Sequence, residues 1–430
     1  MCKKIIFAAI WATACSSAWA QTSPNISATR GMSFDELAQI TLNGNKELQA
    51  ARESLRQADA RLVQARLWPN PSIDLSKKTD APFADEGDNG YAVTFSQPVE
   101  LGGKRANRSR VAELSIAVAK ADIAEAERQL IGRLRILFDT AIGTAARLDL
   151  FERLERVNDQ MVGVMNVRLR AGDASQLDSR LLVAQTNQVH AERLVAENQL
   201  TGAVLQIRTL AGLSPTEPFL MRRPTGTPTV RETEGTIVTR ALQNRPDVTA
   251  ARLREELADA GISLAKSRAV PDATAFVRYG QEGVPFQLDA GTQRRIFERE
   301  KVLEFGVSVP LPLFNREQGN ISEAASRRTQ VRTEREGLEA TVRQEAVAAF
   351  RRYDTARKTM EILQSGVLEQ HQESFRIVQL AYGLGEFRLI DIVNQQRVLI
   401  DAETTYVNAE TELEAARAEL ERVVGATVPQ

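Results

Sequence analysis

The chain has 430 residues, and its 55 basic side chains nearly balance 56 acidic ones, giving a formal net charge of −1. This balance argues against a nucleic-acid-binding protein, which ordinarily carries a basic excess. Hydrophobic residues make up 43% and charged residues 26%, which excludes a disordered chain and a bundle of apolar membrane helices. Two cysteines and two histidines leave little for a zinc site or thiol chemistry, so we expect no cofactor.

The first twenty residues have the pattern of a secretory signal peptide. Lys3 and Lys4 precede an uncharged apolar stretch at 5–14, which is too short to span a bilayer of about 30 Å as a helix. Small residues occupy the −3 and −1 positions of a cleavage site, which comprises Ala18, Ala20 and Gln21. We therefore expect an exported protein. An alternative places a lipid-acylated N-terminus at Cys15.

The sequence after this segment contains an internal repeat of about 200 residues. Residues 48–65 resemble residues 248–265 at an offset of 200, and Gly212 matches Gly425 at an offset of 213. A repeat of this length indicates a duplicated domain. The expected organisation is a signal peptide at 1–20, a first repeat at 21–212, a linker or equatorial segment at 213–244, and a second repeat at 245–430.

Each repeat predicts a helix, a β-hairpin, a long helix and a returning helix. In the first, a helical stretch at 45–67 ends before Trp68-Pro69, because a proline disfavours helix in the residue before it. Tyr91, Val93 and Phe95 then alternate with Thr94 and Ser96, as in a strand with one apolar face. The expected elements are the hairpin at 70–100, the long helix at 103–170 and the returning helix at 176–212.

The second repeat predicts the same elements. We expect a strand at 274–280, a loop at 281–301, and a strand in which Val307 and Val309 share an apolar face opposite Ser308. The hairpin covers 272–311, an unbroken outgoing helix 316–382, and a returning helix 389–424. The apolar positions of the long helices form a narrow seam of mostly small residues, which is typical of coiled coils.

The predicted fold class is mainly α, with long coiled-coil helices and four β-strands per chain. Each strand has about the ten residues of a transmembrane strand, yet a closed barrel needs at least eight strands. The helices have no spare face to cover a four-stranded sheet, so several chains are expected to pool their strands. The alternative is a secreted structural coiled coil with two hairpins.

The ends of the two hairpins carry a family resemblance. Residues 96–105 (SQPVELGGKR) and 307–319 (VSVPLPLFNREQG) resemble outer-membrane efflux proteins of the TolC family, most closely the CzcC-type branch of heavy-metal cation efflux. The resemblance implies a homotrimer with a 12-stranded barrel and an α-helical periplasmic tube, in the outer membrane of a Gram-negative bacterium. It also implies a periplasmic adaptor and an inner-membrane transporter of the resistance-nodulation-division type as partners.

The function implied by this resemblance is a passive exit duct, here for heavy-metal cations. A duct for drugs or other organic compounds is the alternative within the family. No nucleophile elbow, metal-ligand cluster or phosphate-binding loop is found in the sequence, so an enzyme is not expected.

The resemblance also assigns a periplasmic gate, with candidate residues Asp391, Asn394, Tyr382, Arg388 and Asp178. Three copies of Asp391 would form an acidic ring, an arrangement that selects cations. The family's second acid, three residues on, is Asn394 here, and Asp178 is the first-repeat counterpart of Asp391. Tyr382 matches a tyrosine of the closed state, whose usual arginine partner falls at Phe387, beside Arg388. Alternatively, Asp391 only complements its helix dipole.

The turns at the far ends of the helical hairpins form the expected adaptor-docking tip: Gly172, Asp173, Gly383, Gly385 and Glu386. The alternative reading is that these glycines only end helices, since glycine accepts a positive φ. His190 and His371 each stand alone on a helix and are expected at surface or seam positions. Trp68 fits either an interfacial anchor or simple packing.

Overall fold

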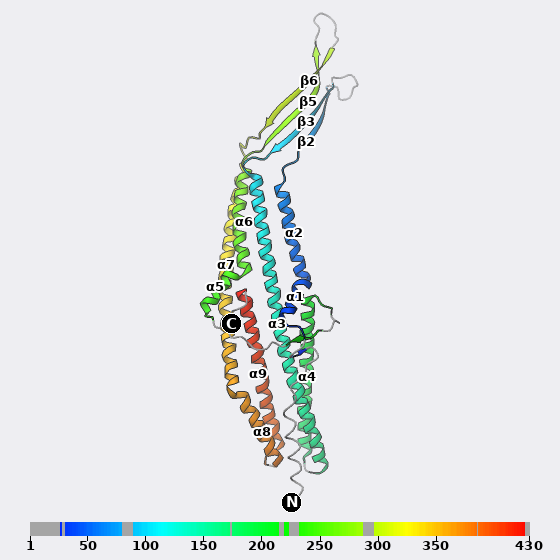
Figure 1. Ribbon diagram of the computed structural model, residues 1–430, viewed down its shortest axis with the longest axis vertical. Helices are drawn as coiled ribbons and strands as arrows, with labels where there is room; N and C mark the ends of the chain where they lie inside the picture. Colours follow the sequence, from blue (N-terminus) through cyan, green and yellow to red (C-terminus); the bar gives the residue numbers. More distant parts are fainter. Residues whose placement is uncertain are drawn as a thin grey trace. The chain divides into compact units, whose positions relative to one another are not determined.

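The computed structural model describes residues 26–27, 31–79, 89–172, 174–214, 219–222, 232–286, 296–384 and 386–425 (Figure 1). The expectations for the cleavage site (Ala18, Ala20 and Gln21), for Cys15, and for Asp173 and Gly385 lie outside these residues. Within the described part of the chain, no helix has a stretch long and apolar enough to cross a membrane.

Long helices dominate the fold, which confirms the expected fold class of long helices with four main strands. The helices are α1 (Phe34–Gly44), α2 (Lys46–Arg66), α3 (Lys104–Arg170), α4 (Gln176–Ala211), α5 (Glu234–Asn244), α6 (Pro246–Arg268), α7 (Gln318–Ile362), α8 (Leu368–Leu384) and α9 (Leu389–Val424). The strands are β1 (Ile26–Ser27), β2 (Ser72–Thr79), β3 (Asn89–Val99), β4 (Met221–Arg222), β5 (Ala273–Phe286) and β6 (Ile296–Ser308).

The chain divides into two compact units, and each unit draws on both repeats. The first unit comprises residues 1–51, 124–246 and 340–430, and the second comprises residues 52–123 and 247–339. The sequence repeat therefore does not coincide with the compact units.

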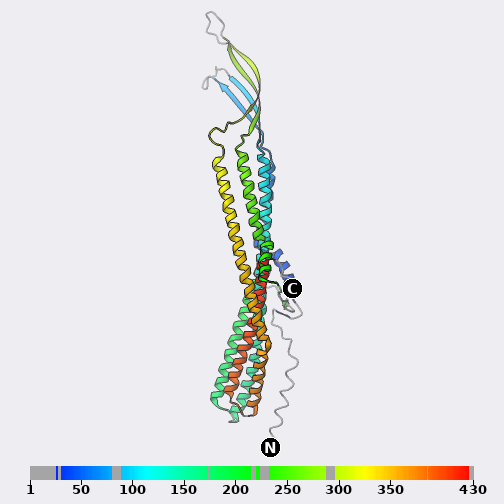
Figure 2. The same ribbon diagram turned by 90° about the vertical axis from the view of Figure 1, so that its left-hand side faces the viewer.

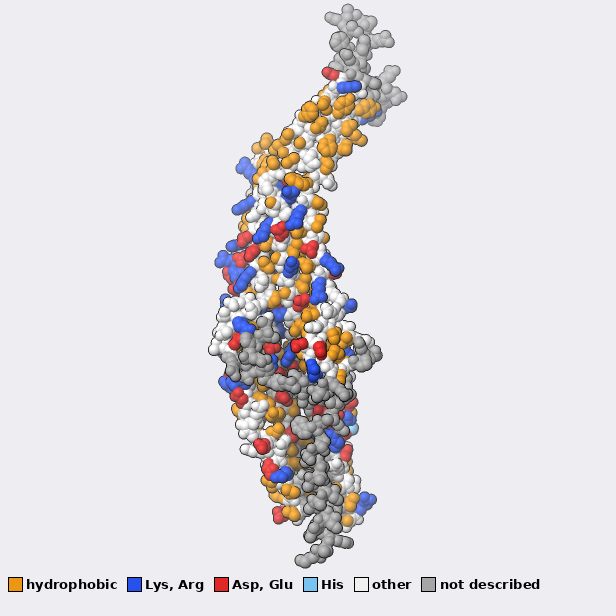
Figure 3. Space-filling model, viewed as in Figure 1, with side chains coloured by type: hydrophobic (Ala, Val, Ile, Leu, Met, Phe, Trp, Pro, Cys, Tyr) orange, Lys and Arg blue, Asp and Glu red, His pale blue; other side chains and the backbone are white. Residues whose placement is uncertain are grey.

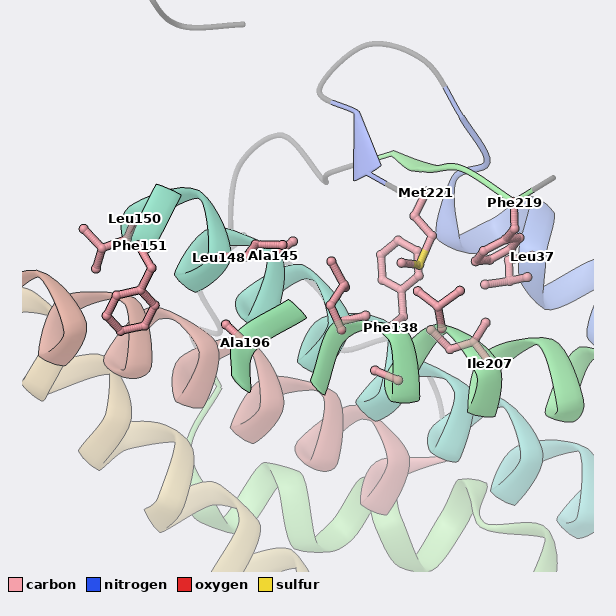
Figure 4. Close-up of a cluster of buried hydrophobic side chains, with 14 of the residues drawn as sticks. Leu37, Phe138, Ala145, Leu148, Leu150, Phe151, Ala196, Ile207, Phe219 and Met221 are labelled. Atoms are coloured by element: carbon pink, nitrogen blue, oxygen red, sulfur yellow. The ribbon is translucent and has the colours of Figure 1, made fainter. Parts of the chain in front are cut away.

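The core of the first unit lies where α1 packs on α3 and α4 (Figure 4). Phe138 of α3 is 1% exposed, and its ring meets Phe34 edge-on at 5.7 Å between ring centroids. Leu37, Ile207 and Met221 surround the same ring in Figure 4. The expected seam is seen here: Leu130, Leu134 and Ala141 of α3 are buried.

Helices α1 and α5 were not expected, although local signals for α1 are present. Ser33 and Glu36 form a reciprocal capping box. The backbone N–H of Ser33 donates to Oε2 of Glu36 at 2.8 Å, and the backbone N–H of Glu36 donates to Oγ of Ser33 at 3.3 Å. Thr233 caps α5 by accepting a hydrogen bond from the N–H of Thr236. Residues 234–244 of the expected linker therefore form a regular helix.

The outgoing helix of the second repeat is not unbroken, contrary to the expectation for 316–382. A π-helical turn, Leu363–Val367, separates α7 from α8. Gly366 has φ 110° and ψ −1°, a conformation that side chains with a Cβ rarely adopt. The corresponding helix of the first repeat, α3, runs through 67 residues without such a break, about 100 Å at 1.5 Å per residue.

The second unit contains an antiparallel sheet with strand order β2-β3-β5-β6. Strand β5 pairs with β6 along 13 positions, so residues 281–286 and 296–301 of the expected loop form strand instead. The four consecutive charged residues at 298–301 interrupt the apolar–polar alternation of a strand, so in the sequence they resemble a loop. A two-stranded parallel pair, β1-β4, lies in the other unit.

The two faces of this sheet differ in polarity. One face carries Val93, Tyr279 and Leu303 in a single cross-strand row, each at least 46% exposed. The opposite face carries Thr94, Arg278 and Glu304 in the adjoining row, and Arg278 and Glu304 form an ion pair at 3.6 Å. Figure 3 shows hydrophobic side chains gathered over the sheet. We call the face that holds Leu303 the apolar face.

Candidate functional site

The two helical hairpins of the first unit, α3–α4 and α8–α9, have their turns at the same end of the unit (Figure 2). One cluster of apolar side chains joins them there. Met165 of α3, Leu182 of α4 and Leu389 of α9 are its buried members. Tyr382 of α8 and Val393 of α9 pack against them. We call these five residues the tip cluster. The tip cluster joins the end of the α3–α4 hairpin to the end of the α8–α9 hairpin, so the turns of both repeats lie beside the same cluster.

Tyr382 has an arginine partner that the sequence did not reveal. Nη1 of Arg168 donates a hydrogen bond to the Tyr382 hydroxyl at 2.8 Å, and its guanidinium lies 5.1 Å from the ring centroid. Arg168 comes from the last turn of α3, 214 residues away in sequence. The expected partner position at Phe387 or Arg388 is therefore not the one the structure pairs with Tyr382. No local motif could have indicated this contact.

Asp391 lies in the first turn of α9. Its Oδ2 accepts a hydrogen bond from the backbone N–H of Arg388 at 2.9 Å. This bond gives a partner to the backbone N–H of the residue that precedes the helix. A negative charge here also complements the helix dipole. The side chain of Asp391 is half-buried, whereas Asn394 and Arg388 are exposed.

Asp178 occupies the corresponding first turn of α4. Its N–H and that of Leu177 both donate to the hydroxyl oxygen of Ser175, the N-cap residue. Its side chain is half-buried, as is that of Asp391. Both acids thus stand at the N-terminus of a returning helix, at matching places in the two repeats.

The turns beside the tip cluster contain the expected docking residues that the structure describes. Gly172 ends α3 with φ 79°, and its N–H donates to the carbonyl of Leu169. The N–H of the exposed Glu386 donates to the carbonyl of Ala381 and so closes the end of α8. Gly383 lies within α8.

A buried amide pair joins α3 to α9 at Asn158 and Gln396. Nε2 of Gln396 donates to Oδ1 of Asn158 at 2.6 Å, and both residues are at most 1% exposed. The second polar atom of each amide has no hydrogen-bond partner. A buried polar pair of this kind fixes helix register at a cost in stability. Sequence reasoning missed this pair because its members lie 238 residues apart.

The two histidines do not form a metal site. His190 is 51% exposed and its Nδ1 contacts Oε1 of Glu155. His371 lines a shallow groove of about 310 Å³ beside the helix break, together with Asp401 and Tyr406. Within the described residues, no group of three or more histidine, cysteine or acidic side chains is arranged to hold a metal ion.

The first unit also contains a buried carboxylate, Asp139 of α3. It accepts a hydrogen bond from Nε of Arg135 at 2.9 Å, and its side chain is 2% exposed. Burial raises the pKa of Asp139 to about 6, against the opposing attraction of Arg135. Glu414, Arg417 and Glu421 of α9 also act on this ion pair.

We expect the Asp139 carboxylate to make stability depend on pH. Its pKa of about 6 in the folded chain exceeds the ordinary 3.8, so the folded state holds the proton more tightly. The resulting stabilisation is complete below the unfolded pKa and is lost as the pH rises through 6. Relative to Asp139→Asn, the parent should gain about 1 kcal/mol when the pH falls from about 7.5 to about 5. Denaturant unfolding of both proteins measures this, and a constant difference would contradict it.

The comparisons with known proteins agree with the fold. The model of the outer membrane efflux protein family matches residues 37–213 and 237–426, so the chain belongs to this family of outer-membrane efflux proteins. The two matched segments correspond to the two repeats. The resemblance seen in the sequence is thereby confirmed.

Individual relatives match most of the chain. The cobalt-zinc-cadmium resistance protein CzcC of Cupriavidus metallidurans is 23% identical and covers 92% of this chain and 90% of its own. The nickel and cobalt resistance protein CnrC of the same organism is 27% identical over 73% of this chain and 72% of its own. The solved structure of CusC has a TM-score of 0.76 at 15% identity, covering 91% of this chain and 92% of its own, which shows a shared fold.

Proposed function

We propose that this outer-membrane efflux protein is the passive exit duct of a tripartite system and conducts heavy-metal cations. The observation that carries the proposal is the amphipathic sheet, whose apolar face is exposed and whose opposite face holds the Arg278–Glu304 ion pair. Such a sheet suits lipid on one side and a watery lumen on the other. The names of CzcC and CnrC support metal cations as the cargo.

The edges of this sheet support the homotrimer that is part of this proposal. Among the described strands, β2 and β6 each pair on one side only. Four strands cannot close on themselves, whereas three copies supply twelve. Because β2 and β6 run in opposite directions, β6 of one copy can continue the antiparallel order beside β2 of the next. The periplasmic adaptor and the resistance-nodulation-division transporter are further partners in this proposal, with the turns at Gly172 and Glu386 as the docking tip.

Deletion of the gene in its own host tests the cargo. We expect the deletion strain to lose resistance to cobalt, zinc, cadmium or nickel salts, and complementation to restore it. Sensitivity only to organic compounds would favour the alternative duct for drugs. Unchanged resistance to both, together with a monomer on native gels, would favour the structural coiled coil.

The proposed gate consists of an acidic ring of Asp391 near the threefold axis, with the Arg168–Tyr382 bond holding α8 to α3. Repulsion between two carboxylates in a watery lumen is about 1 kcal/mol at close range. The ring would attract divalent cations that bridge the acids. The hydrogen bond of Arg168 to Tyr382 is one contact that opposes the repulsion.

Asp391→Asn separates this role from helix capping. Asparagine keeps an oxygen for the N–H of Arg388 but removes the charge. We expect a folded trimer that shows weaker block by divalent cations and lower cation preference in planar-bilayer recordings. Asn394→Asp, at an exposed neighbouring position, should strengthen the block. If Asp391→Asn and the parent show the same block and selectivity, Asp391 only caps α9.

A further inference from the structure

Trp68 and Arg105 form a stacked pair beside the sheet of the second unit. Trp68 lies between the end of α2 and the start of β2, and it is 56% exposed. The guanidinium carbon of Arg105, the second residue of α3, lies 4.1 Å from the centroid of the Trp68 ring. This is a close cation–π contact, and it holds both side chains at the surface.

The pair stands at the end of the apolar face. Gln97 of β3 projects to the same face as Phe95, two residues away, because side chains alternate along a strand. Its Nε2 donates a hydrogen bond to the carbonyl of Pro69 at 3.0 Å. The Trp68-Pro69 segment therefore borders the apolar face where the strands meet the helices. Leu67 and Leu101, both exposed, add apolar surface nearby.

Two neighbouring cations are paired with acids, whereas the contact that the structure gives Arg105 is with the Trp68 ring. Lys104 pairs with Asp272 at 2.8 Å, and Arg66 pairs with Glu113 at 3.0 Å. Within the described residues, no carboxylate lies within 4.0 Å of the Arg105 guanidinium, and its side chain is exposed. An aromatic ring and an uncompensated arginine at the end of a lipid-facing surface fit the headgroup layer of a membrane.

We propose that Trp68 and Arg105 bind the phosphate of an anionic phospholipid headgroup in the periplasmic leaflet. The Trp68 ring lies at the boundary between headgroups and acyl chains, and the Arg105 guanidinium donates its N–H groups to the phosphate oxygens. This inference rests on the proposed placement of the apolar face in lipid. We assign the phosphate to a lipid in the bilayer because Trp68 and Arg105 border the apolar face, which contacts acyl chains in the proposed placement.

The test uses the fluorescence of Trp68, the only tryptophan after residue 20. The protein beginning at Gln21 is placed in phosphatidylcholine nanodiscs that contain brominated phosphatidylglycerol or, separately, the same fraction of brominated phosphatidylcholine. Bromine at a shallow acyl position quenches a nearby indole. We expect phosphatidylglycerol to be preferred about fivefold, as the roughly 1 kcal/mol from one basic side chain at an anionic surface implies.

Matched variants assign the preference to Arg105. Arg105→Gln should abolish it, while Arg110→Gln, which removes an exposed arginine from the same helix, should leave it intact. A preference that survives Arg105→Gln, or one that Arg110→Gln also abolishes, would overturn the site. If inorganic phosphate abolishes the preference for phosphatidylglycerol and chloride at the same ionic strength does not, the site binds free anions rather than a lipid headgroup.

Insertion separates this inference from the proposed function. If the parent does not enter nanodiscs as a trimer, the membrane placement fails and the lipid site fails with it. If the parent inserts but shows no preference for phosphatidylglycerol, only the lipid site is overturned.

Discussion

Leu303→Arg is expected to prevent most of the chain from assembling in the membrane. Leu303 lies near the middle of β6, is 57% exposed, and shares a cross-strand row with Tyr279 and Val93. An arginine on the lipid side costs about 2–4 kcal/mol at the bilayer midplane. In the proposed trimer this cost applies to each copy. The yield of heat-modifiable trimer in outer-membrane fractions measures the effect.

Val302→Arg is the matched control for this prediction. Val302 is the neighbouring residue, so it lies at the same depth but faces the polar side of the sheet, opposite Gly280. An arginine there remains in water, and assembly should be nearly normal. Val307, which the sequence pattern also places on the apolar face, is one residue from the end of β6, where the cost falls to about 0–1 kcal/mol. Equal assembly of Leu303→Arg and Val302→Arg would show that the apolar face does not contact lipid.

Phe138→Ala is expected to destabilise the first unit by about 3–5 kcal/mol. The ring is 1% exposed and packs edge-on against Phe34, so its removal leaves a cavity between α1, α3 and α4. The thermal unfolding midpoint of the helical signal in detergent measures the loss. Because α3 also enters the second unit, sheet-dependent assembly should be followed in the same samples.

Val164→Ala is the control on the same helix. Val164 is 47% exposed, so truncation removes little buried surface and should shift the midpoint only slightly. If both variants unfold at the same temperature, the cluster around Phe138 does not hold the unit together.

Local signals in the sequence explain why some elements were predictable. The start of α4 follows the cap Ser175, and its end precedes Gly212 in the left-handed conformation, so 176–212 could be read from residue types alone. The alternation around Val93 likewise indicated a strand with one apolar face, and the register now shows which neighbours share that face.

Other features depend on contacts between distant segments and carry no local signal. The Arg168–Tyr382 bond joins two repeats across 214 residues, and neither residue stands in a motif that requires the other. The length of the β5–β6 hairpin was missed because the run of charged residues at 298–301 looks like a loop. The break at Leu363–Val367 was missed because a single glycine in a helix usually costs only about 1 kcal/mol and leaves the helix continuous.

The interruption between α7 and α8 gives the two halves of the chain different mechanical properties. In α3, a bending force is opposed by an uninterrupted ladder of backbone hydrogen bonds, whereas the second repeat has a weak point at Ser365 and Gly366. Bending is therefore expected at that point, and it would move α8, which contains Tyr382, relative to α7. In the proposed threefold assembly, three stiff hairpins would alternate with three that bend more easily, although both kinds have the same element order.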